Sequence, residues 1–240
     1  MPHRFASLLA LACALLAASL VHADEDAVRK AFNAKFPKAQ VQSVTKLPYL
    51  GLYEIVIDGE VLYADEDFDY LIDGNIIATK NMSNLTEQRK RKLSAIDFDD
   101  LPLDLAMKRV KGKGERRIAV FSDPDCPYCK RVENDLAKLD NVTIYMFLYP
   151  IDSLHPRATE ISKQIWCSPD RLKAWDDYML RKVAPKADSG CANPVDKIVE
   201  YGRKKGINAT PTLIMPSGER VPGAISAAQI EEHLSGSKPN

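Results

Sequence analysis

Two cysteines separated by two residues, Cys126 and Cys129, constrain the fold of this chain more than any other feature. The apolar run 118–121 precedes them and predicts a buried strand, which the Asp-Pro-Asp sequence of residues 123–125 brings to an end. Pro127 is favourable at the first position of a helix, since its missing N–H would have no partner there. The pattern predicts a strand, a short turn and a helix that begins at the cysteine pair.

A cysteine at the N-terminus of a helix is more acidic than a free cysteine. Unpaired backbone N–H groups and the helix dipole would favour the thiolate of Cys126, which is the attacking species in disulfide exchange. Charged residues of both signs flank the motif and leave the size of this effect open. Cys129, one turn further along, would be buried and less acidic. We therefore expect Cys126, at the exposed end of the helix, to attack and Cys129 to resolve the resulting mixed disulfide.

Two other interpretations of the pair are a permanent structural crosslink and half of a zinc site. Zinc needs two further ligands close by. The remaining cysteines are far from the pair and from each other, and His155 and His233 are isolated in the sequence. A redox-active pair fits the position between strand and helix better than either alternative, and we expect no metal.

Residues 1–23 have the pattern of a secretory signal peptide, with cleavage expected after Ala23. Arg4 supplies the positive charge, and an almost wholly apolar or small stretch, residues 5–21, follows it. A transmembrane anchor would need a longer apolar run, and acidic residues begin directly after Ala23. Lipid attachment at Cys13 would need a different local sequence. We therefore expect an exported protein.

Export bears on the cysteines, because disulfides persist in oxidising compartments. Of the five cysteines, Cys13 would leave with the signal peptide, so four remain. An even number in an exported protein indicates two disulfides, and four cysteines allow three connectivities. The short gap makes Cys126 and Cys129 the natural pair, which leaves Cys167 and Cys191.

Residues 24–80 predict a small α+β domain. A helix is expected over 24–36, because apolar residues recur there at helical spacing and Pro37 follows. Short strands, separated by glycine-containing turns, are expected near 41–44, 52–57, 61–63, 70–72 and 76–78. So small a region buries little apolar surface alone, and a second copy of itself is the simplest partner. We interpret it as a dimerisation domain.

Residues 81–99 are expected to contain a charged linker helix over 84–96. Asn84 can cap it, and Glu87 three residues later completes a capping-box pattern. The basic run 89–92 could bind nucleic acid, but the chain has 33 basic and 33 acidic residues and therefore no general positive field. A solvated helix face that connects two domains explains this run better, and we expect no nucleic-acid partner.

Residues 100–240 alternate between strand and helix patterns in the order of an α/β thioredoxin-like fold with a helical insertion. Strands are expected at 118–121, 142–148, 212–215 and 220–221. Helices are expected at 129–139, 156–181, 195–205 and 226–234. Thr210-Pro211 directly precedes the third of these strands, and on general grounds an X–Pro bond is trans.

Several short segments away from the cysteine pair are together far more specific than the pair alone. They are Val61-Leu62-Tyr63, Phe121-Ser122-Asp123, Ile165-Trp166-Cys167, Ala174-Trp175-Asp176-Asp177, Ala209-Thr210-Pro211 and Val221-Pro222-Gly223. With these segments the chain resembles the DsbC/DsbG family of periplasmic disulfide isomerases over essentially its whole mature length. The dipeptide Pro127-Tyr128 resembles DsbG, whereas DsbC typically has Gly-Tyr, and the second pair, Cys167 and Cys191, resembles DsbC.

The resemblance implies a V-shaped homodimer in which the N-terminal domain dimerises and an uncharged cleft holds misfolded, disulfide-containing exported proteins. It implies that Pro211 is cis and packs beside Cys126, and that the backbone of Thr210 pairs with an extended substrate segment. It also implies a periplasmic location and a DsbD-type membrane reductase as partner, and we expect no cofactor. Val120 stands where thioredoxin has a buried aspartate, so no carboxylate of that kind is expected as a proton acceptor for Cys129.

We expect a reduced-state isomerase in which Cys126 attacks a wrong disulfide, and the mixed disulfide either rearranges or is resolved by Cys129. Cys167 and Cys191 would form a buried structural disulfide. Two alternatives remain open: a DsbG-like reductase of sulfenylated cysteines, and a holdase chaperone whose cleft binds unfolded chains without chemistry. A monomeric oxidase fits less well, because it would not need residues 24–80.

Overall fold

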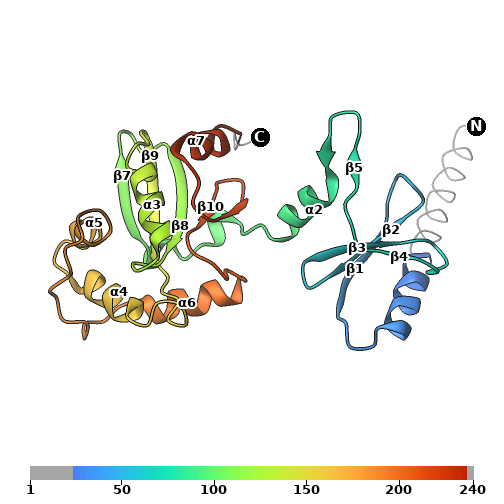
Figure 1. The fold of residues 1–240 in the computed structure, drawn as a ribbon, viewed down its shortest axis with the longest axis horizontal. Coiled ribbons are helices and arrows are strands. Elements are labelled where there is room, and N and C mark those ends of the chain that lie inside the picture. The colour runs from blue at the N-terminus through green and yellow to red at the C-terminus, as the bar shows by residue number, and fades with distance from the viewer. Residues whose placement is uncertain (1–23, 237–240) are drawn as a thin grey trace, which may run out of the picture. The chain divides into compact units, whose positions relative to one another are not determined.

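The computed structural model describes residues 24–236, which form two compact units divided between Ser94 and Ala95 (Figure 1). The expected signal peptide, residues 1–23, lies outside the described residues. Each unit has a hydrophobic core of its own, so each is described by itself. Within residues 24–236, no helix has the length and apolar character needed to span a membrane.

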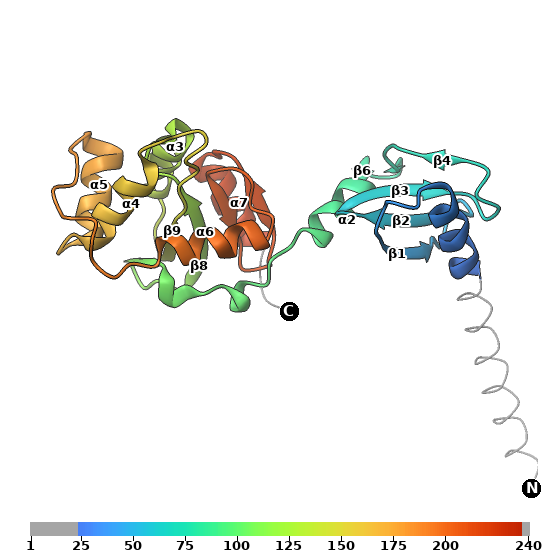
Figure 2. The same ribbon diagram turned by 90° about the horizontal axis from the view of Figure 1, so that it is seen from below.

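The first unit is a four-stranded antiparallel sheet covered on one face by a helix over residues 24–35 (Figure 2). Its strands lie side by side in the order of the sequence: β1 (Val41–Lys46), β2 (Tyr53–Ile57), β3 (Glu60–Ala64) and β4 (Leu71–Ile72). Val28 and Phe32 of the helix pack against Val44, Tyr53 and Ile55 of the sheet. The apolar residues that predict this helix and these strands are therefore the ones that form the core.

A short hairpin and a charged helix complete the first unit. They are β5 (Ile77–Ala78), β6 (Ser83–Asn84) and α2 (Leu85–Leu93). The Asn84 side chain accepts a hydrogen bond of 3.0 Å from the Glu87 N–H and so caps α2 as predicted. Thr86, however, is buried, and its hydroxyl lies 2.6 Å from the Tyr63 hydroxyl on β3. This polar contact holds α2 against its own sheet, and no residue of α2 belongs to a hydrophobic core cluster among the described residues.

The second unit has a mixed five-stranded sheet in the order β11-β10-β8-β9-β7. Its strands are β7 (Met107–Lys111), β8 (Arg116–Ser122), β9 (Val142–Leu148), β10 (Thr212–Ile214) and β11 (Arg220–Pro222). β8 and β9 are parallel, and the other neighbours are antiparallel. The sequence predicts all of these strands except β7. That strand lies at the edge of the sheet and has few apolar residues, so its pattern is weak.

Five helices pack on this sheet: α3 (Pro127–Leu136), α4 (Ala158–Cys167), α5 (Arg171–Arg181), α6 (Val195–Lys204) and α7 (Ala227–Gly236). α3 and α6 lie on opposite faces of the sheet (Figure 1, Figure 2). The helical stretch predicted over 156–181 is two helices, because Asp170 interrupts it and caps α5 by accepting from the Lys173 N–H. The second unit therefore has the predicted thioredoxin-like fold, with α4 and α5 as its helical insertion.

A disulfide joins Cys167, at the end of α4, to Cys191 in the segment before α6. This is the pairing expected from the sequence. The expectation that it is buried is wrong, since Cys167 is half-buried and Cys191 is exposed. The neighbouring Trp166 turns into the core instead, so Cys167 faces the connection that runs over the surface.

A carboxyl group is buried beneath the helix that carries the cysteine pair. Glu133 on α3 has a fully buried side chain, and its closest cation is Arg109 on β7, with 3.7 Å between Nη1 and Oε2. Arg109 makes its hydrogen bond to Asp176 on α5 instead. Burial raises the pKa of Glu133 to about 7, against the opposing effect of Arg109. Val120 is apolar and buried as expected, but Glu133 places an acid in this core that the sequence does not reveal.

The first prediction concerns the pH dependence of stability. Because the folded-state pKa of Glu133 is raised to about 7 from its ordinary 4.5, folding favours the protonated acid and becomes less favourable as pH rises between those values. Glu133→Gln cannot ionise. Urea unfolding measures the free energy of unfolding of the variant and of wild type. The difference between them should shift in favour of the variant by about 3 kcal/mol between pH 4 and pH 8. Glu160→Gln, on the exposed side of α4, is the control. A difference between variant and wild type that is independent of pH would contradict the assignment.

Candidate active site

The cysteine pair lies where β8 ends and α3 begins. Cys126 is the residue that precedes α3, and Pro127 is its first helical residue, as the sequence predicts. The Cys126 N–H donates to the carbonyl of Asp123 at 3.2 Å, which closes the turn between strand and helix. Both cysteines are free thiols. The helix N-terminus therefore presents its unpaired N–H groups to the sulfur of Cys126.

Cys126 is covered by the loop that precedes β10. Its sulfur lies 3.4 Å from the carbonyl oxygen of Thr210, and the Thr210–Pro211 peptide bond is cis. Only 4% of the Cys126 surface is exposed, so the expectation of an exposed helix end is wrong for this side chain. The loop that contains Thr210 and Pro211, far from Cys126 in the sequence, covers this side chain. A substrate would reach the sulfur of Cys126 through the small exposed area beside Thr210.

The two sulfurs have opposite acidities. A hydrogen bond from the Cys129 thiol, helped by the backbone N–H groups of Cys129 and Tyr128, lowers the pKa of Cys126 to about 5, against the opposing effect of burial. Burial raises the pKa of Cys129 far above its ordinary value, and the neighbouring Cys126 adds to this effect. Near neutral pH, Cys126 is therefore a thiolate and Cys129 keeps its proton. The predicted roles of an attacking and a resolving thiol would require such a difference in acidity.

Asp123 organises the turn that holds both cysteines. Its backbone N–H points at the Cys129 sulfur, 3.4 Å away. Its buried carboxylate accepts hydrogen bonds from the N–H groups of Asp125 at 2.8 Å and Ile151 at 2.7 Å. The ring of His155 lies 3.0 Å from the same carboxylate. The sequence shows Asp123 and His155 only as separate residues, and their pairing requires the fold that brings the end of β9 beside the end of β8.

The helical insertion also reaches the motif. The Tyr178 hydroxyl on α5 donates to the Asp125 carboxylate at 2.5 Å, and the Lys130 ammonium group lies 5.0 Å from the centre of the Tyr178 ring. Burial, and then the bond to Asp125, raise the pKa of Tyr178 to about 12, so this hydroxyl remains a donor. Tyr128, between the cysteines, is 59% exposed and gives the surface beside the pair an aromatic side chain.

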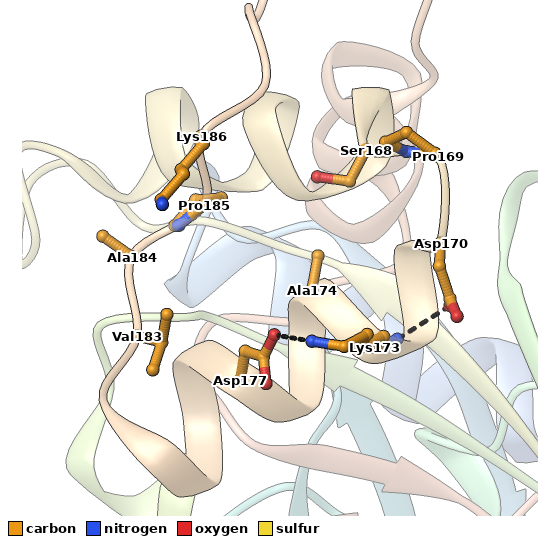
Figure 3. A pocket seen from close by; sticks show the side chains of 10 residues that line it. All are labelled: Ser168, Pro169, Asp170, Lys173, Ala174, Asp177, Val183, Ala184, Pro185 and Lys186. Carbon is orange, nitrogen blue, oxygen red and sulfur yellow. Dashed lines mark hydrogen bonds and ion pairs between the residues drawn. The ribbon is translucent and has the colours of Figure 1, made fainter.

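A separate hollow of about 450 Å³ lies between the start of α5 and the segment that follows this helix (Figure 3). A hydrogen bond of 2.6 Å between the Lys173 ammonium group and the Asp177 carboxylate crosses its floor. Neither Cys126 nor Cys129 lines it. Among residues 24–236, no group of three His, Cys, Asp or Glu side chains could hold a metal ion.

Two protein-family models match the chain, one in each unit. A disulfide bond isomerase protein N-terminal domain matches residues 19–87, and a thioredoxin-like domain matches residues 103–237. A disulfide interchange protein of known crystal structure from Neisseria gonorrhoeae is 43% identical, with a TM-score of 0.56 over 58% of this chain and 100% of that one. A thiol-disulfide exchange protein from Wolbachia pipientis, 18% identical with a TM-score of 0.50, shares the fold.

Curated relatives are similar over most of the chain. The probable thiol:disulfide interchange protein DsbC of Bordetella pertussis is 41% identical over 209 residues, which are 87% of this chain and 74% of that protein. The thiol:disulfide interchange protein DsbC of Escherichia coli is 26% identical over 226 residues, or 92% of each chain. The similarity thus includes both units.

The second prediction tests the acidity of the pair. Iodoacetamide should alkylate Cys126 of the reduced protein with a rate that rises through a midpoint near pH 5, while the buried Cys129 stays unmodified. Cys129→Ala removes the hydrogen bond that contributes most to this shift and should raise the midpoint, whereas Cys129→Ser retains a donor and should raise it less. Mass spectrometry of the cysteine peptide after timed alkylation gives the rates. A midpoint between about pH 8 and pH 9, as for an ordinary thiol, would exclude the assignment.

Proposed function

The chain belongs to the DsbC family of disulfide isomerases and is a thiol:disulfide interchange protein, and we propose that Cys126 and Cys129 perform this activity on incorrect disulfides of exported proteins. The observation that carries the assignment is the placement of the pair, with Cys126 directly before α3 and beside the Thr210 carbonyl, and with Cys129 buried in the core. This placement gives the two sulfurs opposite acidities. The two alternatives, a reductase of sulfenylated cysteines and a holdase chaperone, are not favoured by relatives whose names specify disulfide interchange.

The reaction begins when the Cys126 thiolate attacks one sulfur of a substrate disulfide. A bond forms between Cys126 and that sulfur, and the other substrate sulfur leaves as a thiolate and takes a proton from water. A second substrate thiol can then attack the mixed disulfide, which isomerises the substrate and releases Cys126. Alternatively Cys129 attacks Cys126, which leaves the substrate reduced and the pair oxidised.

The surface beside the pair is suited to an extended segment of an unfolded chain. We propose that the backbone at Thr210, before the cis Pro211, pairs with such a segment by strand addition. The contact between the Thr210 carbonyl and the Cys126 sulfur supports this, because a segment bound there would place its sulfur beside Cys126. Pro127 fixes the start of α3, and the exposed Tyr128 offers an apolar face to the substrate.

We propose that the first unit forms a homodimer. Large apolar side chains are exposed directly before β4, on β4, on the hairpin that follows and at the turn within it: Tyr70, Leu71, Ile72, Ile77 and Met82. β4 is also an edge strand, whose unpaired backbone groups can bind a strand from a second copy. An isomerase has to hold a non-native chain while its cysteines rearrange, and two catalytic units joined in this way would provide that grip.

The remaining proposals concern the setting of the reaction. A signal peptide over residues 1–23, cleaved after Ala23, would deliver the protein to the periplasm, where disulfides persist. Each substrate reduction oxidises Cys126 and Cys129, so a membrane reductase of the DsbD type would restore the thiols without a bound cofactor. The disulfide between Cys167 and Cys191 would be structural, since it joins the insertion to the segment before α6.

The experiment that tests the assignment separates the two cysteines. Cys126→Ser should abolish isomerisation of scrambled ribonuclease, because no thiolate remains to attack. Cys129→Ser should instead accumulate covalent adducts with substrate, visible on non-reducing gels, because the internal resolving thiol is absent. Cys167→Ser/Cys191→Ser is the control and should retain exchange activity. Isomerisation by Cys126→Ser at the wild-type rate would refute the proposed mechanism.

A further prediction separates the holding of a non-native chain by the dimer from the thiol–disulfide exchange reaction itself. Leu71→Arg should place a charge in the proposed dimer interface, giving a monomer in sedimentation that still reduces insulin but isomerises scrambled ribonuclease poorly. Val110→Arg is the matched control, because Val110 is an exposed apolar residue of β7 in the second unit. A monomeric Leu71→Arg protein with full isomerase activity would show that the dimer is not needed.

A further inference from the structure

Ser122, the last residue of β8, lies on the side of the sheet that holds the cysteine pair. Side chains alternate between the two faces along a strand, so Ile118, Val120 and Ser122 share one face. Ile118 and Val120 belong to the same core cluster as Cys129 and α3. The Ser122 side chain, fully buried, therefore points into the apolar region that surrounds the Cys129 sulfur.

The hydroxyl of Ser122 has no hydrogen-bond partner, although it is enclosed in the core. Buried hydroxyl groups are normally hydrogen-bonded, so an unpaired one requires an explanation. The hydroxyl of Ser122 affects the pKa of the neighbouring Cys129 thiol. Burial raises the pKa of Cys129 most, and the hydroxyl of Ser122 and the N–H of Asp123 both act to lower it. The Asp123 N–H lies 3.4 Å from the Cys129 sulfur, and the unpaired Ser122 hydroxyl lies in the same buried region.

These donors matter most at one moment of the reaction. In the resting protein Cys129 carries a proton and gains little from them. When it attacks the mixed disulfide at Cys126, it must become a thiolate inside an apolar core, where an unpaired charge is costly. A donor that is held near the position where charge develops, and is not bonded elsewhere, stabilises that transition state with little reorganisation.

We propose that Ser122 is a catalytic residue of the resolving step, with its hydroxyl as a hydrogen-bond donor to the Cys129 thiolate. The inference rests on the proposed function, since it assigns a role within the internal attack of Cys129. In that step the Cys129 sulfur bonds to the Cys126 sulfur and the bond from Cys126 to the substrate breaks. The proton lost by Cys129 passes through solvent to the released substrate thiolate, and Ser122 keeps its own proton.

The two steps can be followed in one experiment on the full-length reduced protein. The reagent dithiobis(nitrobenzoate) is a small disulfide that releases one coloured thiolate when Cys126 attacks it and a second when Cys129 resolves the adduct. Stopped-flow absorbance gives both rates. Ser122→Ala should slow the second phase by about tenfold or more, as expected for loss of one hydrogen bond to a charged group, and should change the first phase much less.

The chain supplies a matched control and a pair of isosteric variants. Ser162 on α4 is also fully buried, with a hydroxyl that has no hydrogen-bond partner, so Ser162→Ala makes the same change in another part of the core. Ser122→Thr and Ser122→Val have nearly the same shape, and only threonine has a hydroxyl. Threonine should resolve faster than valine, and Ser162→Ala should resolve at the wild-type rate.

The outcomes separate this inference from the function on which it rests. Equal second-phase rates in wild type and Ser122→Ala, or in the threonine and valine variants, would overturn the role of Ser122 and leave the two cysteines as assigned. A wild-type protein that releases no first thiolate would refute the attack by Cys126 itself. A slow second phase in Ser162→Ala as well would indicate a general effect of core packing and would also overturn the inference.

Discussion

The site depends on one constraint: Cys129 must be buried while Cys126, three residues earlier, stays within reach of substrate. A helix that begins at Cys126 meets both conditions, because its first turn carries Cys129 inward against β8. Burial then raises the pKa of Cys129 and keeps it protonated, and its S–H donates to Cys126 and lowers the pKa there. The acidity of the attacking sulfur is thus a consequence of where the core lies.

Asp123 connects this constraint to the rest of the second unit. A turn of a few residues between a strand and a helix would be mobile if its polar groups were left to water. The buried carboxylate instead accepts the N–H groups of Asp125 and Ile151 and contacts the His155 ring, so the turn is fixed to the end of β9. Asp125 is held in turn by Tyr178 of α5. The helical insertion therefore helps to hold the cysteine pair in place. A substitution in α5 that removes the bond between Tyr178 and Asp125 would alter the turn that precedes Cys126.

Local signals predict the parts of the structure that are local. The strand before the pair, the helix start at Pro127 and the cap at Asn84 are each determined by a few neighbouring residues, and all are observed. What the sequence misses depends on distant segments. Cys126 is covered by Thr210, Glu133 is enclosed by β7 and α5, and Thr86 meets Tyr63. β7 itself has a weak pattern because an edge strand needs few apolar residues. Ser122 looks like an ordinary strand end until the fold places Cys129 beside it.

The balance between isomerisation and reduction can be understood from the same core. Proximity alone would favour Cys129, since a neighbouring thiol competes with any substrate thiol at a very high effective concentration. Burial works against that advantage, because a protonated Cys129 does not attack and a charged one is costly in the apolar core. Each donor aimed at the Cys129 sulfur restores part of its rate. The exposed surface around Tyr128 and Thr210 would thus select which chains bind. The buried surroundings of Cys129 would decide how long a bound chain has to find its correct disulfide.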